Sequence, residues 1–130
     1  MKVLYVEDDE MSMRLVETVL RRRGDCVLLS ARDGEAGLRL AAVMRPDLVL
    51  LDLHLPDMSG ERFLRCLRAP AQAGTAPVVV LSADARPETA ARLLAAGAAH
   101  FLTKPLVLAQ LHRRIDDATT SAGADDQEAS

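Results

Sequence analysis

At four places in this 130-residue chain, a short apolar run leads directly into polar side chains that can take part in chemistry. These residues are the acids Glu7, Asp8 and Asp52, the hydroxyl of Ser82 and the amine of Lys104. Grouped carboxylates raise one another's pKa and destabilise a fold unless they are compensated. A hard divalent cation relieves this, and Mg²⁺ prefers oxygen ligands. Such a site can hold phosphate oxygens and neutralise the charge that develops during phosphoryl transfer.

Each residue type would have its own part in that chemistry. Asp52 would be the nucleophile, because carboxylates form aspartyl-phosphate intermediates. Ser82 would donate a hydrogen bond to one phosphoryl oxygen, and Lys104 would bring a positive charge to another. A proline follows Lys104, and an X-Pro bond adopts the cis form at modest cost, which would turn the lysine inward.

These side chains can act together only if the fold brings the apolar runs side by side. Residues 48–51 and 78–81 are continuous apolar runs bounded by turn signals, the pattern of strands buried on both faces. Further strands are predicted at 2–6, 26–31 and 99–103. Helical spacing fills the intervals between the strands. Gly24 would end the first helix, Asp33 would cap the second, Ser59 or Gly60 would open the third, Pro87 suits the first turn of the fourth, and Pro105 would start the fifth.

Strict alternation of strands and helices predicts an α/β fold, a doubly wound parallel sheet with helices on two faces. In such sheets ligands bind beyond the carboxyl ends of the strands, at the switch point of strand order. The acids, the hydroxyl and the amine are therefore expected to meet in one crevice.

Composition narrows the function classes. The length suits a single domain, and the net charge of −3, with no basic run longer than residues 21–23, argues against direct nucleic-acid binding. No apolar run approaches the roughly 18 residues of a membrane span, and acids follow the N-terminus too soon for a signal peptide. The two cysteines lack metal spacing and are expected to be reduced thiols in a cytoplasmic protein.

Five motifs together resemble the receiver domain of response regulators in two-component signalling, a CheY-like domain. They are Val-Glu-Asp-Asp at 6–9, Leu-Pro-Asp-Met-Ser-Gly at 55–60 after Asp52, Leu-Ser-Ala at 81–83, Ala-Ala-Gly-Ala at 95–98 and Phe-Leu-Thr-Lys-Pro at 101–105. The resemblance covers residues 2–116. We therefore expect a receiver domain at 1–117 and a polar, flexible tail at 118–130, which lacks apolar anchors.

The resemblance implies a five-stranded, flavodoxin-like sheet of order 2-1-3-4-5. It implies phosphotransfer from a histidine kinase or a histidine phosphotransfer domain to Asp52, with Lys104 and Ser82 contacting the phosphoryl group. It also implies Mg²⁺, for which Mn²⁺ can substitute, bound by Asp8, Asp52 and the backbone carbonyl of His54, with Glu7 acting through water. On this view the chain is a phospho-acceptor and not an enzyme with a separate substrate.

The family's switch couples the hydroxyl at Ser82 to the aromatic ring at Phe101. Phosphorylation would shift the population between two states of the face formed by the fourth helix, fifth strand and fifth helix, where a downstream partner would bind. Phenylalanine replaces the commoner tyrosine, so a hydroxyl that could mark the outward state is lost. A homodimer through the fourth and fifth helices stays open.

Three rival classes of protein share part of this pattern. A haloacid-dehalogenase-like phosphatase would need a second acid where His54 stands. A flavodoxin would need a hydroxyl- and glycine-rich phosphate cradle after the first strand, where acids stand instead. A pseudo-receiver would bind partners without being phosphorylated. The sequence also leaves open whether this is a stand-alone receiver or part of a hybrid kinase or larger regulator.

Overall fold

Strands and helices alternate along the whole described chain. The computed structural model describes residues 1–70, 72 and 75–129, with side chains described up to residue 120. Within these residues five strands alternate with five helices: β1 (Lys2–Val6), α1 (Glu10–Arg23), β2 (Val27–Ala31), α2 (Gly34–Met44), β3 (Leu48–Asp52), α3 (Gly60–Leu67), β4 (Val78–Ser82), α4 (Pro87–Ala95), β5 (His100–Thr103) and α5 (Leu108–Ala129).

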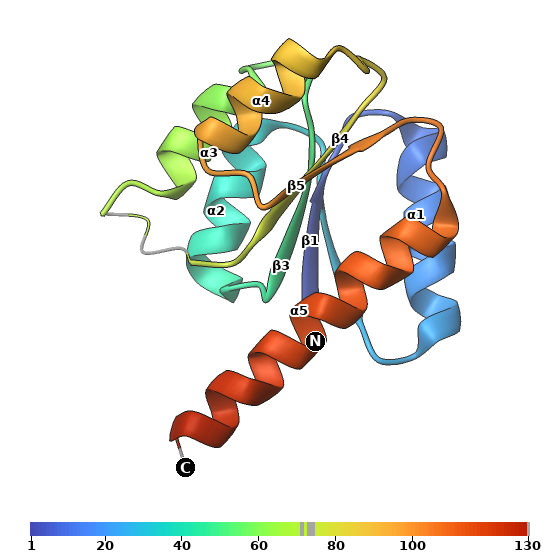
Figure 1. The fold of residues 1–130 in the computed structure, drawn as a ribbon, viewed down its shortest axis with the longest axis vertical. Helices are drawn as coiled ribbons and strands as arrows, with labels where there is room; N and C mark the ends of the chain where they lie inside the picture. Colours follow the sequence, from blue (N-terminus) through green and yellow to red (C-terminus); the bar gives the residue numbers. More distant parts are fainter. Residues whose placement is uncertain (71, 73–74, 130) are drawn as a thin grey trace.

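The strands form one parallel sheet of order β2-β1-β3-β4-β5, as predicted (Figure 1). The central strands β3 and β4 are buried along their full length, which explains their unbroken apolar runs. In the register of this sheet Asp52 lies opposite Leu81, and Ser82 lies opposite Thr103. The polar ends of the strands are therefore at the same edge.

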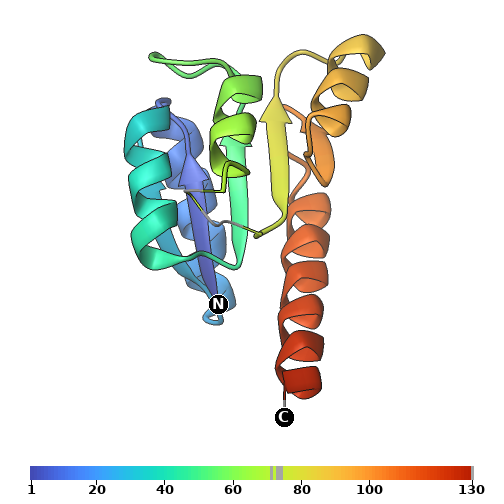
Figure 2. The same cartoon turned by 90° about the vertical axis from the view of Figure 1, so that its left-hand side faces the viewer.

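Two apolar layers hold the helices against the sheet. Helices α1 and α5 pack on one face, and α2, α3 and α4 pack on the other (Figures 1 and 2). Alternate residues of β1 serve the two layers: Val3 and Tyr5 face α1 and α5, whereas Leu4 and Val6 face the opposite layer. In the described part of the chain, no helix combines the length and the apolar character needed to cross a membrane.

Local signals in the sequence set the helix ends. The side chain of Asp33 accepts a hydrogen bond from the backbone N–H of Ala36 at 2.7 Å, and Ser59 caps α3 in the same way. Gly24 ends α1 in the left-handed conformation, with φ 76°, and Pro87 occupies the first turn of α4. These four predictions are confirmed.

Helix α5 differs from expectation at both ends. It begins at Leu108 instead of directly at Pro105, and it continues to Ala129, so the expected boundary at residue 117 falls inside the helix. Ala118 is buried in the layer between α5 and the sheet, and Thr119 donates a hydrogen bond to the carbonyl of Ile115. The packed helix therefore extends past residue 117, into the stretch predicted to be a flexible tail.

Smaller differences concern the ends of strands and one loop. The second and fifth strands begin one residue later than the predicted 26 and 99. The loop predicted at 70–75 includes residues 71, 73 and 74, which lie outside the described residues.

Candidate metal and phosphoryl site

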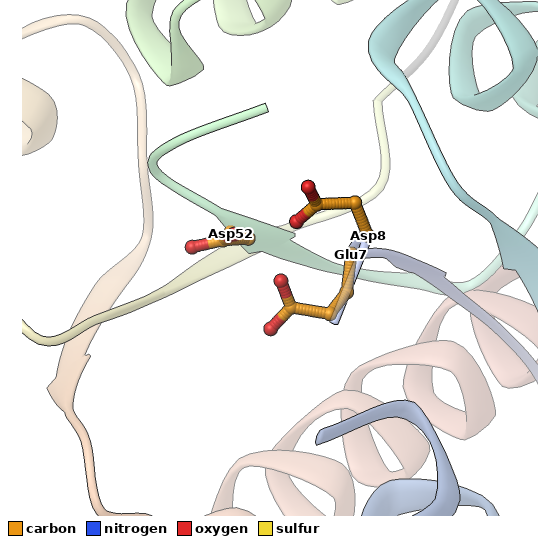
Figure 3. Close-up of side chains that lie close together, drawn as sticks. All are labelled: Glu7, Asp8 and Asp52. Atoms are coloured by element: carbon orange, nitrogen blue, oxygen red, sulfur yellow. The ribbon is translucent and has the colours of Figure 1, made fainter. Parts of the chain in front are cut away.

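Three carboxylates gather at the carboxyl-end edge of the sheet. Glu7 and Asp8 directly follow β1, and Asp52 is the last residue of the neighbouring strand β3. One oxygen from each of these side chains lies within 4.8 Å of the other two, and Figure 3 shows them converging from the two strands. Glu7 and Asp52 are buried, whereas Asp8 is exposed.

The amine of Lys104 joins this cluster from the end of β5. Its Nζ lies 2.5 Å from Oε1 of Glu7 and 3.8 Å from Oδ1 of Asp52. The peptide bond between Lys104 and Pro105 is cis, the form that the sequence allowed. Without a phosphoryl group, the lysine is therefore paired chiefly with Glu7.

Tyr5 also belongs to the site, although no motif in the sequence assigned it a role there. Its hydroxyl donates a hydrogen bond of 2.9 Å to Oε1 of Glu7, the oxygen that also contacts Lys104. The sequence did contain an indication of this role, because a tyrosine in a buried strand needs a hydrogen-bond partner for its hydroxyl. Side chains two positions apart in a strand face the same way, so Glu7 was the nearest candidate.

Burial and mutual repulsion disturb the ionisation of the carboxylates. Burial, followed by the hydrogen bond and charge of Glu7, raises the pKa of Asp52 to about 7. Burial acts to raise the pKa of Glu7 as well, but hydrogen bonds from Asp52, Lys104 and Tyr5 outweigh it and hold that pKa below its ordinary value. A proton thus resides on Asp52 in preference to Glu7, as expected for crowded acids with a single amine among them.

The donor set fits a hard divalent cation. Among the described residues, Oε2 of Glu7 is buried and accepts no hydrogen bond. An unpaired buried charge is costly, and a cation held by Asp8 and Asp52 would compensate it. The backbone N–H of His54 lies 3.4 Å from Oδ1 of Asp52, so the residue whose carbonyl was predicted as a ligand lies beside the cluster, with its side chain exposed.

The loop that carries His54 is held at its base and at its tip. At the base, His54 and Ser59 form an isolated antiparallel bridge, and the N–H of Gly60 donates to the carbonyl of Leu53 at 3.0 Å. At the tip, the carboxylate of Asp57 accepts hydrogen bonds from the N–H groups of Gly34 and Glu35, at 2.8 and 3.0 Å, in the first turn of α2. These hydrogen bonds at the tip could not be predicted from the sequence, because no local pattern links residue 57 to residue 34.

Ser82 and Phe101 lie on the neighbouring strands β4 and β5. Ser82 is fully buried, and its Oγ accepts a hydrogen bond of 3.0 Å from the N–H of Asp84. Asp84 in turn accepts hydrogen bonds from Arg86 and Thr89, which fix the start of α4. Phe101 is half-buried against the layer of α2, α3 and α4. The expected coupling between Ser82 and Phe101 stays a prediction.

A comparison with protein-family models matches residues 3–116 to the response regulator receiver domain. The chain therefore belongs to the receiver-domain family of two-component response regulators. Receiver domains are signalling domains, and they bind Mg²⁺ at an acidic pocket of the kind described above.

Curated relatives and solved structures agree with this assignment. The cell cycle transcriptional regulator CtrA of Caulobacter vibrioides is 38% identical over 116 residues, which cover 86% of this chain and 49% of CtrA. The KDP operon transcriptional regulatory protein KdpE of Escherichia coli is 40% identical over 113 residues, 87% of this chain and 48% of KdpE. The chain thus spans about half the length of these relatives.

Among solved structures, the receiver domain of the Francisella response regulator 1452 superposes with a TM-score of 0.85 at 28% identity. The match covers 93% of this chain and 98% of that one. The likeness extends over nearly the whole of that receiver domain, which agrees with the α/β sheet order found here.

Proposed function

We propose that this chain is a phosphorylation-dependent switch that accepts a phosphoryl group onto Asp52 from a histidine kinase or a histidine phosphotransfer domain. The observation that carries the proposal is the convergence of Glu7, Asp8, Asp52 and Lys104 from three strand ends onto one point. A nucleophilic carboxylate beside two further acids and one amine suits phosphoryl transfer assisted by Mg²⁺.

In the proposed reaction an oxygen of Asp52 attacks the phosphorus of phosphohistidine. The new O–P bond forms as the N–P bond breaks, and the histidine nitrogen keeps the electron pair. Mg²⁺, when bound, supplies positive charge to the phosphoryl oxygens. Lys104 would leave Glu7 and turn its ammonium to the phosphoryl group, while Ser82 would donate its hydroxyl hydrogen. Hydrolysis by water would later release phosphate and restore Asp52.

The ionisation of Asp52 bears on this step. Because its pKa is raised to about 7, a large fraction of Asp52 is protonated near neutral pH and is then a poor nucleophile. A bound cation favours the ionised form and displaces that proton. On this proposal, phosphorylation of Asp52 would depend on Mg²⁺.

An exposed apolar surface beside the site suits the phosphodonor. Met11 is 81% exposed and Leu15 is 43% exposed on α1. Both line a groove of about 600 Å³ together with Lys104, Pro105 and Leu106, which follow β5. A helix that packed its apolar side here could bring a phosphohistidine to Asp52.

A downstream partner is proposed to bind the face formed by α4, β5 and α5 and to distinguish the phosphorylated from the unphosphorylated state there. Withdrawal of Ser82 toward the phosphoryl group would change the start of α4, because Asp84 binds both Ser82 and that helix. Phe101 would then turn inward. The same face would serve a homodimer, if one forms.

Phosphorylation by a small donor tests the proposal most directly. The protein is incubated with labelled acetyl phosphate and Mg²⁺, and the bound phosphate is tested for acid lability and hydroxylamine sensitivity. We expect one such phosphate, absent with EDTA and absent in Asp52→Ala. Retained label in Asp52→Ala would refute the acceptor assignment. A wild-type chain that takes no label from acetyl phosphate or from histidine kinases would be a pseudo-receiver.

A further inference from the structure

Tyr5 is the single tyrosine of the chain, and it lies fully buried in β1, two residues before Glu7. Its ring packs in the layer between the sheet and helices α1 and α5. This position does not need a hydroxyl for packing, since Val3 and Leu50 fill neighbouring places in the same layer with purely apolar side chains. A buried hydroxyl is costly unless it is paired, so its presence calls for a reason other than filling space.

The partner of this hydroxyl is the most buried acid of the site. Glu7 is 1% exposed, and the hydroxyl of Tyr5 at 2.9 Å and the amine of Lys104 at 2.5 Å both donate to the same oxygen, Oε1. Two donors on one oxygen fix the plane of a carboxylate. The other oxygen, Oε2, is therefore held in place and accepts no hydrogen bond from the described residues.

We propose that Tyr5 is a positioning residue of the metal and phosphoryl site, an inference that rests on the proposed function. Its hydroxyl keeps Glu7 oriented so that Oε2 is presented to the cation or to the water that the cation holds. Residues that orient metal ligands from the second layer commonly contribute 10- to 100-fold to affinity. Tyr5 is such a second-layer residue, because it contacts Glu7 and not the cation itself.

Sharing Oε1 has a second consequence, for Lys104. The lysine must leave Glu7 when it turns to a phosphoryl group, and Glu7 is then left buried with one donor fewer. With Tyr5 in place, one hydrogen bond to Oε1 remains after the lysine departs. With phenylalanine at residue 5, the departure would leave Oε1 without either of these donors, and the lysine would be held back.

Replacement of Tyr5 by phenylalanine tests this inference with a minimal change, because only the hydroxyl is lost. We expect Mg²⁺ binding, measured by calorimetry on the unphosphorylated protein, to weaken about tenfold in Tyr5→Phe. Phe63→Leu is the matched control. Phe63 is fully buried in the opposite layer, so this change loosens the core without touching the site, and Mg²⁺ affinity should be unchanged.

A spectroscopic measurement needs no variant at residue 5. With one tyrosine in the chain, tyrosine labelled with carbon-13 at the phenolic carbon gives a single NMR signal. We expect that signal to move in Glu7→Gln and again when Mg²⁺ is added to the wild-type protein. A signal that moves in neither case, or unchanged Mg²⁺ affinity in a folded Tyr5→Phe, would overturn the inference.

The failure of this inference is distinguishable from failure of the proposed function. If the wild-type protein neither binds Mg²⁺ nor takes phosphate onto Asp52, the proposed function is wrong. If the wild-type protein does both and Tyr5→Phe behaves identically, Tyr5 has a packing role alone.

Discussion

Replacing Asp52 by asparagine should stabilise the metal-free protein near neutral pH, although it removes the phospho-acceptor. Asp52 is 8% exposed and lies within a cluster of acids, so its negative charge is unfavourable in the fold. Asparagine keeps the shape of the side chain without the charge. Its amide N–H can donate a hydrogen bond to a neighbouring carboxylate, which the ionised side chain of Asp52 cannot do.

The size of the effect follows from the ionisation of Asp52, whose pKa is raised from 3.8 to about 7. Between these values the folded state holds a proton that the unfolded state has released, so stability falls as the pH rises through this window and levels off above it. At about 1.4 kcal/mol per pKa unit, the upper limit is roughly 4 kcal/mol. The lowered pKa of Glu7 acts in the opposite direction. We therefore expect a net gain of about 1–3 kcal/mol above neutrality.

Urea unfolding followed by circular dichroism measures this difference directly. Wild type and Asp52→Asn are compared in EDTA at about pH 4 and about pH 7.5. We expect the two proteins to be nearly equally stable at the lower pH and the variant to be more stable at the higher one. Added Mg²⁺ should narrow the gap, because it binds the wild-type fold preferentially. A gap that is independent of pH, or a variant less stable at pH 7.5, would refute the electrostatic argument.

Three further predictions concern other parts of the molecule. Lys104→Ala should keep Mg²⁺ binding in calorimetry but weaken the change in partner affinity on phosphorylation, and an unchanged shift would count against its proposed role. Leu15→Glu should slow phosphotransfer from a histidine kinase and leave labelling by acetyl phosphate unaltered; equal slowing with both donors would argue against donor docking on α1. Asp57→Ala removes two hydrogen bonds to the first turn of α2 and should lower stability by about 1 kcal/mol in thermal unfolding, the typical loss for a helix N-cap; no loss would mean that the loop is anchored elsewhere.

Most of the fold was predictable because its signals are local. The buried runs of β3 and β4, the caps at Asp33 and Ser59 and the glycine at residue 24 each act within a few residues of chain. Alternation of strands and helices then restricts the topology to a parallel sheet. The grouping of the site residues was predictable as well, since residues at the carboxyl ends of parallel strands lie at the same edge of the sheet.

The features that escaped prediction depend on contacts between distant segments. Nothing near Asp57 in the sequence indicates that its carboxylate reaches the N–H groups at the start of α2. The length of α5 escaped for a related reason. Ala118 is a small residue in a polar stretch, and it is buried only because it continues the face of Leu111 and Ile115 toward the sheet. Tyr5 and Glu7 are two positions apart and so lie on the same face of a strand, but the sequence pattern indicated only that Tyr5 belongs to a strand.

The ion pair between Glu7 and Lys104 joins residues that are 97 positions apart. A ribosome that has delivered the first three strands has already made every acid of the cluster, yet the amine that balances them is still to be synthesised. The nascent chain thus carries an unbalanced patch of negative charge until its last strand docks. A product that ended before β5 would therefore lack both the last strand of the sheet and the amine that offsets the charge of Glu7.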